Sequence, residues 1–149
     1  MVRFVLPTSL VVLATLVTTG CNTYSDAVGR SRKAYEQHQH ERALGILRSI
    51  ERDTSRLGTE ERAQYAYLRG MTDYRIGYKL DARHWLGVAR AIEKDKPGSL
   101  SSDWNARLEE TLQELDQIVH EKGIENVPNT PRHDDDAPAS KKAKSDEAT

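Results

Sequence analysis

Apolar residues recur at helical spacing on both sides of a glycine in the middle of the chain. Positions three and four residues apart share one face of an α-helix, so the pattern predicts two amphipathic helices that fold back on each other around Gly77. We expect the small residues Gly70 and Ala82 to let the two backbones come close, with Trp85 filling the space beside them. The two stripes consist of Tyr67, Gly70, Met71 and Tyr74 before the turn and Ala82, Trp85, Leu86 and Ala89 after it.

A similar helical hairpin precedes this one. Ser25 or Asp26 is a suitable N-cap for its first helix. Its second helix has the same apolar spacing, carried by Ala43, Ile46, Leu47 and Ile50. Tyr35 and Ala43 occupy the places that Tyr74 and Ala82 have in the later hairpin. The chain therefore contains an internal repeat of a helix pair, over residues 25–53 and 60–93, and such repeats indicate stacked helical hairpins.

A longer helix follows the second hairpin. Pro97 and Gly98 end the hairpin, Ser101 or Ser102 is the expected N-cap, and Gly123 ends the helix. We interpret residues 102–122 as a capping helix that covers the exposed side of the last hairpin, because two hairpins alone bury little surface. The alternative is a docking helix that pairs with a partner chain. The apolar face consists of Trp104, Leu108, Leu112, Leu115 and Val119.

The N-terminal segment has the composition of a secretory signal peptide. Arg3 is followed by a mostly apolar run over residues 4–17, which is too short for a membrane-spanning helix of about 20 residues. Cys21 is the only cysteine in the chain, so it cannot form an internal disulfide. We expect residues 1–20 to be removed and Cys21 to have a different role.

Residues 17–21, Val-Thr-Thr-Gly-Cys, resemble the lipobox of bacterial lipoproteins, although Thr18 stands where that family usually has leucine. The resemblance implies that Cys21 becomes the N-terminus and carries acyl chains that anchor it in a membrane. Residues 21–24 would then be a lipidated N-terminus with a short tether. Asn22, by similarity to enterobacterial sorting, favours the outer membrane over the inner membrane.

The helix pairs resemble the tetratricopeptide repeat (TPR) family. The second unit carries the resemblance in Leu68, Gly70, Gly77, Ala82 and Leu86. The resemblance implies an all-α fold in which antiparallel hairpins stack as a short TPR-like solenoid over residues 25–123. It also implies a concave face, formed by the first helix of each pair, that binds a peptide or a protein; alternatively, the tyrosines pack between the helices. The partner-binding residues implied in this way are Arg32, Tyr35, Gln64, Tyr67, Met71, Tyr74 and Arg75.

Charge and motifs exclude several other functions. The net charge is −1, and residues 21–123 contain equal numbers of basic and acidic residues, so we expect no binding to nucleic acid. No nucleophile elbow, phosphate-binding loop or metalloprotease motif is present, so we predict no catalytic residues, no cofactor and no enzymatic activity. His38 and His40, with Glu36 or Glu41 nearby, are a weak zinc candidate at a turn, and we predict no metal site.

Residues 124–149 change in character. They contain almost no large apolar residues, and we predict a disordered tail. The acidic triplet of residues 134–136 is interpreted as part of this solvated tail and not as a cation site.

Together these features predict a lipid-anchored adaptor or scaffold of the bacterial cell envelope that binds a protein partner. The alternative is a structural spacer or oligomerisation module that pairs through residues 102–122.

Overall fold

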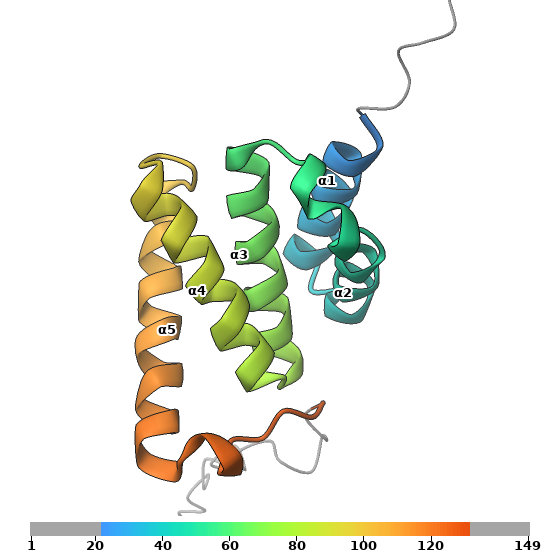
Figure 1. Cartoon of the computed structure of the whole chain (residues 1–149). Helices are drawn as coiled ribbons and strands as arrows, with labels where there is room; N and C mark the ends of the chain where they lie inside the picture. Colours follow the sequence, from blue (N-terminus) through green and yellow to red (C-terminus); the bar gives the residue numbers. More distant parts are fainter. Residues whose placement is uncertain (1–21, 132–149) are drawn as a thin grey trace, which may run out of the picture.

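The computed structural model describes residues 22–131, and this part of the chain consists of helices and connecting turns (Figure 1). The predicted signal peptide, Cys21 and the acidic triplet of residues 134–136 lie outside the described residues. An isolated antiparallel bridge joins Tyr78 to Asn129. The elements are α1 (Asn22–Glu36), α2 (His40–Ser49), the 3-10 helix η1 (Glu51–Arg56), α3 (Thr59–Ile76), α4 (Lys79–Asp95), α5 (Ser102–Lys122) and the 3-10 helix η2 (Ile124–Asn126).

The helices pack as sequential antiparallel pairs (Figure 1). α1 pairs with α2, α3 pairs with α4, and α5 packs along α4. α2 also contacts α3, and α1 and α5 both contact α3, which is therefore the central helix. The all-α class and the antiparallel pairing predicted from the sequence are confirmed.

α3 is buried around most of its circumference because it has neighbours on several sides. Every residue from Tyr65 to Asp73 is buried. A helix that is buried all round does not show a single apolar stripe, and α3 accordingly includes the buried polar residues Arg69, Thr72 and Asp73. The core around it combines large aromatic and aliphatic side chains from four helices, including Leu47, Tyr65, Tyr67, Leu68, Leu86, Leu108, Leu112 and Leu115.

α3 and α4 make their closest contact at Gly70. A Cβ atom at this position would lie 2.6 Å from Leu86 Cγ and 2.9 Å from the Leu86 backbone nitrogen. The sequence correctly predicted a close approach at Gly70. However, Leu86 packs against Gly70, whereas Trp85, the expected filler, lies partly buried against Tyr65 with ring centroids 5.5 Å apart.

The turn between these helices is formed as the sequence predicted. Gly77 has a φ of +118°, which is the left-handed conformation that glycine adopts without steric cost. The backbone N–H groups of Gly77 and Tyr78 both donate to the carbonyl oxygen of Asp73, at 2.9 Å each. These bonds satisfy a carbonyl at the end of α3 and start the return of the chain into α4.

The first helix begins earlier than expected. The sequence placed a tether at residues 21–24 and a helix start at Ser25 or Asp26, but α1 already starts at Asn22. Tyr24 explains the extension, because its ring packs against the core and the Arg56 guanidinium lies 5.6 Å from the ring centroid. Residues 22–24, which were expected to form an extended tether, are therefore the first residues of α1.

The predicted tail also begins later than expected. Residues 124–131 were assigned to a disordered segment, but Val127 is only 6% exposed and η2 packs against α5. Asn129 Oδ1 accepts the N–H groups of Leu80 and Asp81, at 3.1 and 3.3 Å. These N–H groups lie in the first turn of α4, where no helical carbonyl is available. The segment is therefore fixed by the buried side chain of Val127 and by the cap that Asn129 provides to α4. Its polar composition gave no indication of either contact.

Across residues 22–131, none of the helices combines the length and the apolar character needed to cross a membrane.

Replacing Gly70 by alanine tests the contact between α3 and α4. The added methyl group would meet the backbone of Leu86, and overpacking of this kind costs about 1–3 kcal/mol. We expect Gly70→Ala to lower the free energy of unfolding by this amount in urea denaturation. The matched control is Gly45→Ala in α2, where an added Cβ has no atom within 4 Å and alanine is the better helix former. Equal effects of the two substitutions would contradict the close contact.

Candidate functional site

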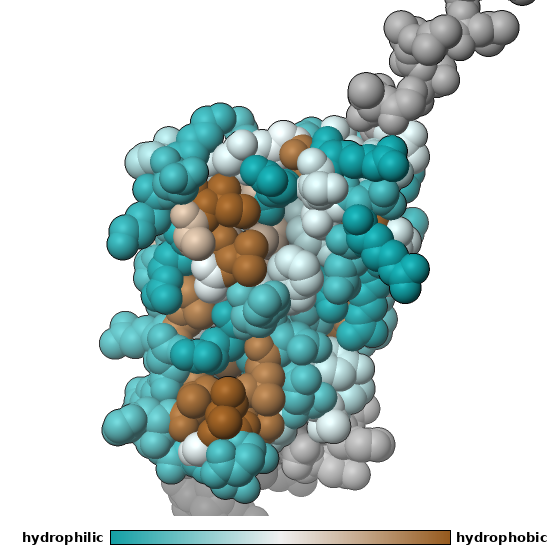
Figure 2. Space-filling model, in the orientation of Figure 1, coloured by the Kyte–Doolittle hydropathy of each residue, from teal (hydrophilic) through white to brown (hydrophobic). Residues whose placement is uncertain are grey.

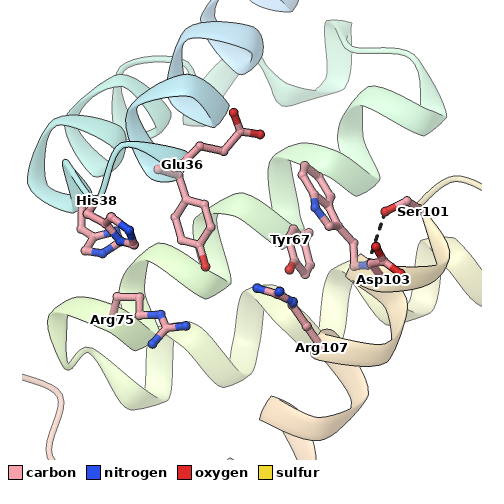
Figure 3. A pocket seen from close by; sticks show the side chains of 10 residues that line it. Glu36, His38, Tyr67, Arg75, Ser101, Asp103 and Arg107 are labelled. Carbon is pink, nitrogen blue, oxygen red and sulfur yellow. Dashed lines mark hydrogen bonds between the residues drawn. The ribbon is translucent and has the colours of Figure 1, made fainter.

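A pocket of about 430 Å³ lies where the end of α1, the start of α2, the middle of α3 and the start of α5 meet (Figure 3). Its lining combines aromatic rings with charged and imidazole side chains. Aromatic surface together with a few convergent polar groups is typical of a binding site. The lining residues are Tyr35, Glu36, His38, His40, Tyr67, Arg75, Ser101, Asp103, Trp104 and Arg107.

One wall of the pocket is a stack of two aromatic rings. Tyr67 of α3 is 1% exposed and stacks on Trp104 of α5, with ring centroids 4.4 Å apart and an angle of 16° between the planes. The Arg32 guanidinium of α1 lies 5.0 Å from the Trp104 ring centroid, within cation–π distance. Trp104 therefore connects all three helices. Burial raises the pKa of Tyr67 to about 12, so its hydroxyl stays protonated at neutral pH.

Two arginines bring positive charge into the pocket. Figure 3 shows Arg75 of α3 and Arg107 of α5 entering it from opposite sides, while the carboxylate of Glu36 points away from both. Among the described residues, neither guanidinium has a carboxylate within ion-pair distance. Guanidinium groups without a carboxylate partner bind carboxylate or phosphate well. Glu36 and Asp103 also line the pocket, so the capacity to hold an anionic group is local to Arg75 and Arg107.

Two histidines also line the pocket. The rings of His38 and His40 lie 5.9 Å apart, and His40 Nδ1 is buried without a hydrogen-bond partner among residues 22–131. Burial, followed by the charges of Arg75 and His38, lowers the pKa of His40 below its usual value. In the described part of the chain, no three His, Cys, Asp or Glu side chains are grouped so that they could hold a metal ion.

Three of the predicted partner-binding residues, Tyr35, Tyr67 and Arg75, line the pocket. Two others lie just beside it: Arg32 contacts Trp104 and donates a short hydrogen bond to Gln64 Oε1. The structure therefore brings five of the seven residues to one region.

The remaining two predicted residues lie elsewhere. Met71 is 3% exposed and belongs to the core. The hydroxyl of Tyr74 donates to Glu114 of α5 at 2.6 Å, so this tyrosine joins two helices.

Sequence reasoning did not assign Trp104 and Arg107 to the site. Both were taken as part of a capping helix, Trp104 as a member of its apolar face. Their spacing of three residues places them one above the other on α5, next to Tyr67 of α3. An aromatic residue followed by arginine at helical spacing was the available signal.

A second group of charged side chains joins α3 to η1, with Arg69 and Asp73 buried and Glu51 exposed. Arg69 donates from Nε to Asp73 Oδ2 at 2.9 Å and from a terminal nitrogen to Glu51 Oε2 at 2.5 Å. Its guanidinium also lies 5.4 Å from the Trp85 ring centroid. Burial raises the pKa of Asp73 to about 6 despite its ion pair with Arg69. None of these residues lines the pocket, so we interpret the cluster as a structural link.

Comparison with protein-family models, with curated proteins and with solved structures finds no match to this chain in any of the three.

The buried Asp73 predicts a specific pH dependence. Because its pKa in the folded protein, about 6, lies above the ordinary value of 3.8, the folded state binds the proton more tightly than the unfolded state. Its contribution to stability must therefore grow as the pH falls from 7 to 4. At 1.36 kcal/mol per pKa unit, the change is about 2–3 kcal/mol at most.

The measurement compares the free energy of unfolding of wild type and Asp73→Asn between pH 4 and pH 7. We expect wild type to gain stability relative to the variant as the pH is lowered. Asp26→Asn, at an exposed position of α1, is the control for replacing a carboxylate. A difference that is independent of pH, or that grows toward pH 7, would contradict the assignment.

Proposed function

We propose that this protein is a lipid-anchored adaptor of the bacterial cell envelope, and that the pocket between α1, α3 and α5 binds a segment of a partner protein. The observation that carries the proposal is the convergence of Trp104, Arg75 and Arg107 on one pocket. Tryptophan, tyrosine and arginine contribute most of the binding energy in protein interfaces. A pocket lined by these residue types is suited to a protein ligand.

The arrangement of the helices supports the TPR-like part of the proposal. α1 and α3 are the first helices of the two antiparallel pairs, and α5 follows as the first helix of an incomplete third pair. All three contribute to the pocket. In a stack of such pairs, the first helices form the concave binding face that the resemblance implies.

The membrane anchor rests on the sequence around Cys21. α1 begins at the next residue, so the folded domain follows the anchor directly. At a rise of 1.5 Å per residue, the 15 residues of α1 span about 22 Å, and the pocket residues Tyr35 and Glu36 lie at the far end. The pocket would thus open about 20 Å from the anchored end. Asn22 favours the outer membrane by the same similarity as above.

The alternative function, a spacer that pairs through α5, has less support. The apolar residues Leu108, Leu112 and Leu115 are buried within this chain, where α5 packs along α4. Ion pairs of Arg83 with Asp116 and of Arg90 with Glu109 also join the two helices. On the face shown in Figure 2, polar side chains divide the apolar surface into separate patches, whereas obligate dimers bury a large continuous area.

Replacing residues of the pocket tests the proposed binding site. Arg75→Ala and Arg107→Ala each remove an exposed cation that lines the pocket, and both changes should leave the fold intact. We expect the double variant to capture its envelope partner at least about tenfold less well, because interface hot spots of this type contribute 2 kcal/mol or more. The measurement is crosslinking in membranes, affinity capture and mass spectrometry.

The control for this experiment is Arg30→Ala, an exposed position of α1 outside the pocket. Circular dichroism of each variant reports whether the helices are retained. Undiminished capture by the Arg75→Ala, Arg107→Ala protein would place the partner on another surface.

The lipid anchor is tested separately. We expect the N-terminal peptide of the mature protein, isolated from membranes, to start at Cys21 and to carry the mass of acyl chains. Cys21→Ser removes the only thiol and should abolish this peptide. Mass spectrometry of the two proteins provides the measurement. An N-terminal peptide with a free thiol in wild type would contradict the anchor and would leave the pocket unaffected.

A further inference from the structure

The pocket presents two guanidinium groups that have no carboxylate partner among residues 22–131. The same chain contains a run of three carboxylates shortly after its last described residue. The guanidinium groups belong to Arg75 and Arg107; the carboxylates of Glu36 and Asp103 also line the pocket, and in Figure 3 that of Glu36 points away from both arginines. The carboxylates are Asp134, Asp135 and Asp136. Oppositely charged groups on one chain meet at a high effective concentration when the connecting segment can span the distance. The segment after Asn129 must therefore be long enough to bring the three aspartates to the pocket.

The path of the chain brings Asn129, close to the last described residue, near the Arg75 side of the pocket. Asn129 is fixed at the start of α4 by its side-chain bonds to Leu80 and Asp81 and by its bridge to Tyr78. Arg75 precedes Tyr78 by three residues on the same turn of the chain. In Figure 3 the ribbon of this last described segment enters at the lower left, on the side of Arg75.

The distances can be bounded from the backbone alone. Tyr78 is three positions after Arg75, which limits the separation of their Cα atoms to about 11 Å. Bridged residues have Cα atoms about 5 Å apart, so the Cα atoms of Arg75 and Asn129 are at most about 16 Å apart. Five extended residues, from Asn129 to Asp134, span about 17 Å, and seven, to Asp136, span about 24 Å. The triplet can therefore reach Arg75, and Arg107 lines the same pocket.

We propose that the pocket is a site for acidic peptide segments and that its occupant in the free protein is the chain's own Asp134–Asp136 segment. Carboxylates accept hydrogen bonds from guanidinium groups in a bidentate manner, and two arginines on opposite sides suit adjacent aspartates. Residues 132–149 contain almost equal numbers of basic and acidic side chains, so the local triplet and not the net charge of the tail supplies the attraction. A partner segment would have to displace it, which makes the tail an intramolecular competitor.

This inference does not need the external partner, so it can be tested without one. The probe is a fluorescently labelled peptide of residues 132–140, and its binding to the full chain, purified in detergent, is measured by anisotropy. The decisive variant is the full chain with D134N, D135N and D136N, which keeps the length of the tail and removes the competing charges. The matched control is D146N with E147Q, which removes two carboxylates from the distal end of the same tail.

We expect the probe to bind the triple variant at least about threefold more tightly than wild type, because a tethered competitor at millimolar effective concentration is lost. The distal control should bind the probe like wild type. Arg75→Ala with Arg107→Ala should abolish binding in both backgrounds, whereas the exposed pair Arg30→Ala with Arg52→Ala should not. Binding should also weaken in 1 M salt, as expected for exposed charges.

Equal affinity of the probe for wild type and the triple variant would overturn the proposal, as would the absence of binding to either. A dimer that depends on the triplet, seen by analytical ultracentrifugation, would also overturn it, since the tail would then occupy the pocket of a second copy. Failure of any of these tests leaves the proposed capture of an envelope partner open, because that experiment has its own readout.

Discussion

The contact between α3 and α4 at Gly70 is the constraint on which the positions of the other helices depend. Because Gly70 has no Cβ, the backbone of Leu86 comes directly against α3, and α4 is fixed at close range. α5 then packs along α4, which places its first turn beside α3. Tyr67, one turn before Gly70, is thereby held against Trp104. The contact between Gly70 and Leu86 thus determines the position of the stacked rings of Tyr67 and Trp104.

The sequence predicted the features that depend on local residue type and spacing. Gly77 ends α3 because its φ is positive, and Ser101 caps α5 by accepting the N–H of Trp104 at 3.3 Å. It did not predict features that depend on contacts between distant residues. Asn129 caps a helix 48 residues earlier in the chain through Asp81, and Trp104 meets Tyr67 across two helices. The pocket is formed by such long-range contacts. The sequence could therefore predict its residues on α1 and α3, but not those on α5.

Two arginines on α3 show how the fold separates stability from binding. Arg69 is buried, and two carboxylates and the ring of Trp85 satisfy its guanidinium, as a buried charge requires. Arg75, almost two turns later, lines the pocket without a carboxylate partner among the described residues. An arginine side chain is thus paired with carboxylates in the core, whereas at the pocket it has no carboxylate partner among the described residues. Departures from charge pairing of this kind are expected at functional sites.

The start of α1 at Asn22 determines how such a pocket would meet its partner. A flexible tether would let the domain rotate and would average over many distances from the membrane. In the proposed lipid-anchored form, a helix directly after the anchor would leave little freedom, since the 15 residues of α1 form a rigid element of about 22 Å. The pocket at the far end of α1 would then sweep a narrow layer near the bilayer surface. In the proposed anchored adaptor, this geometry would favour partners whose acidic segments lie within that layer over contacts that require a long reach.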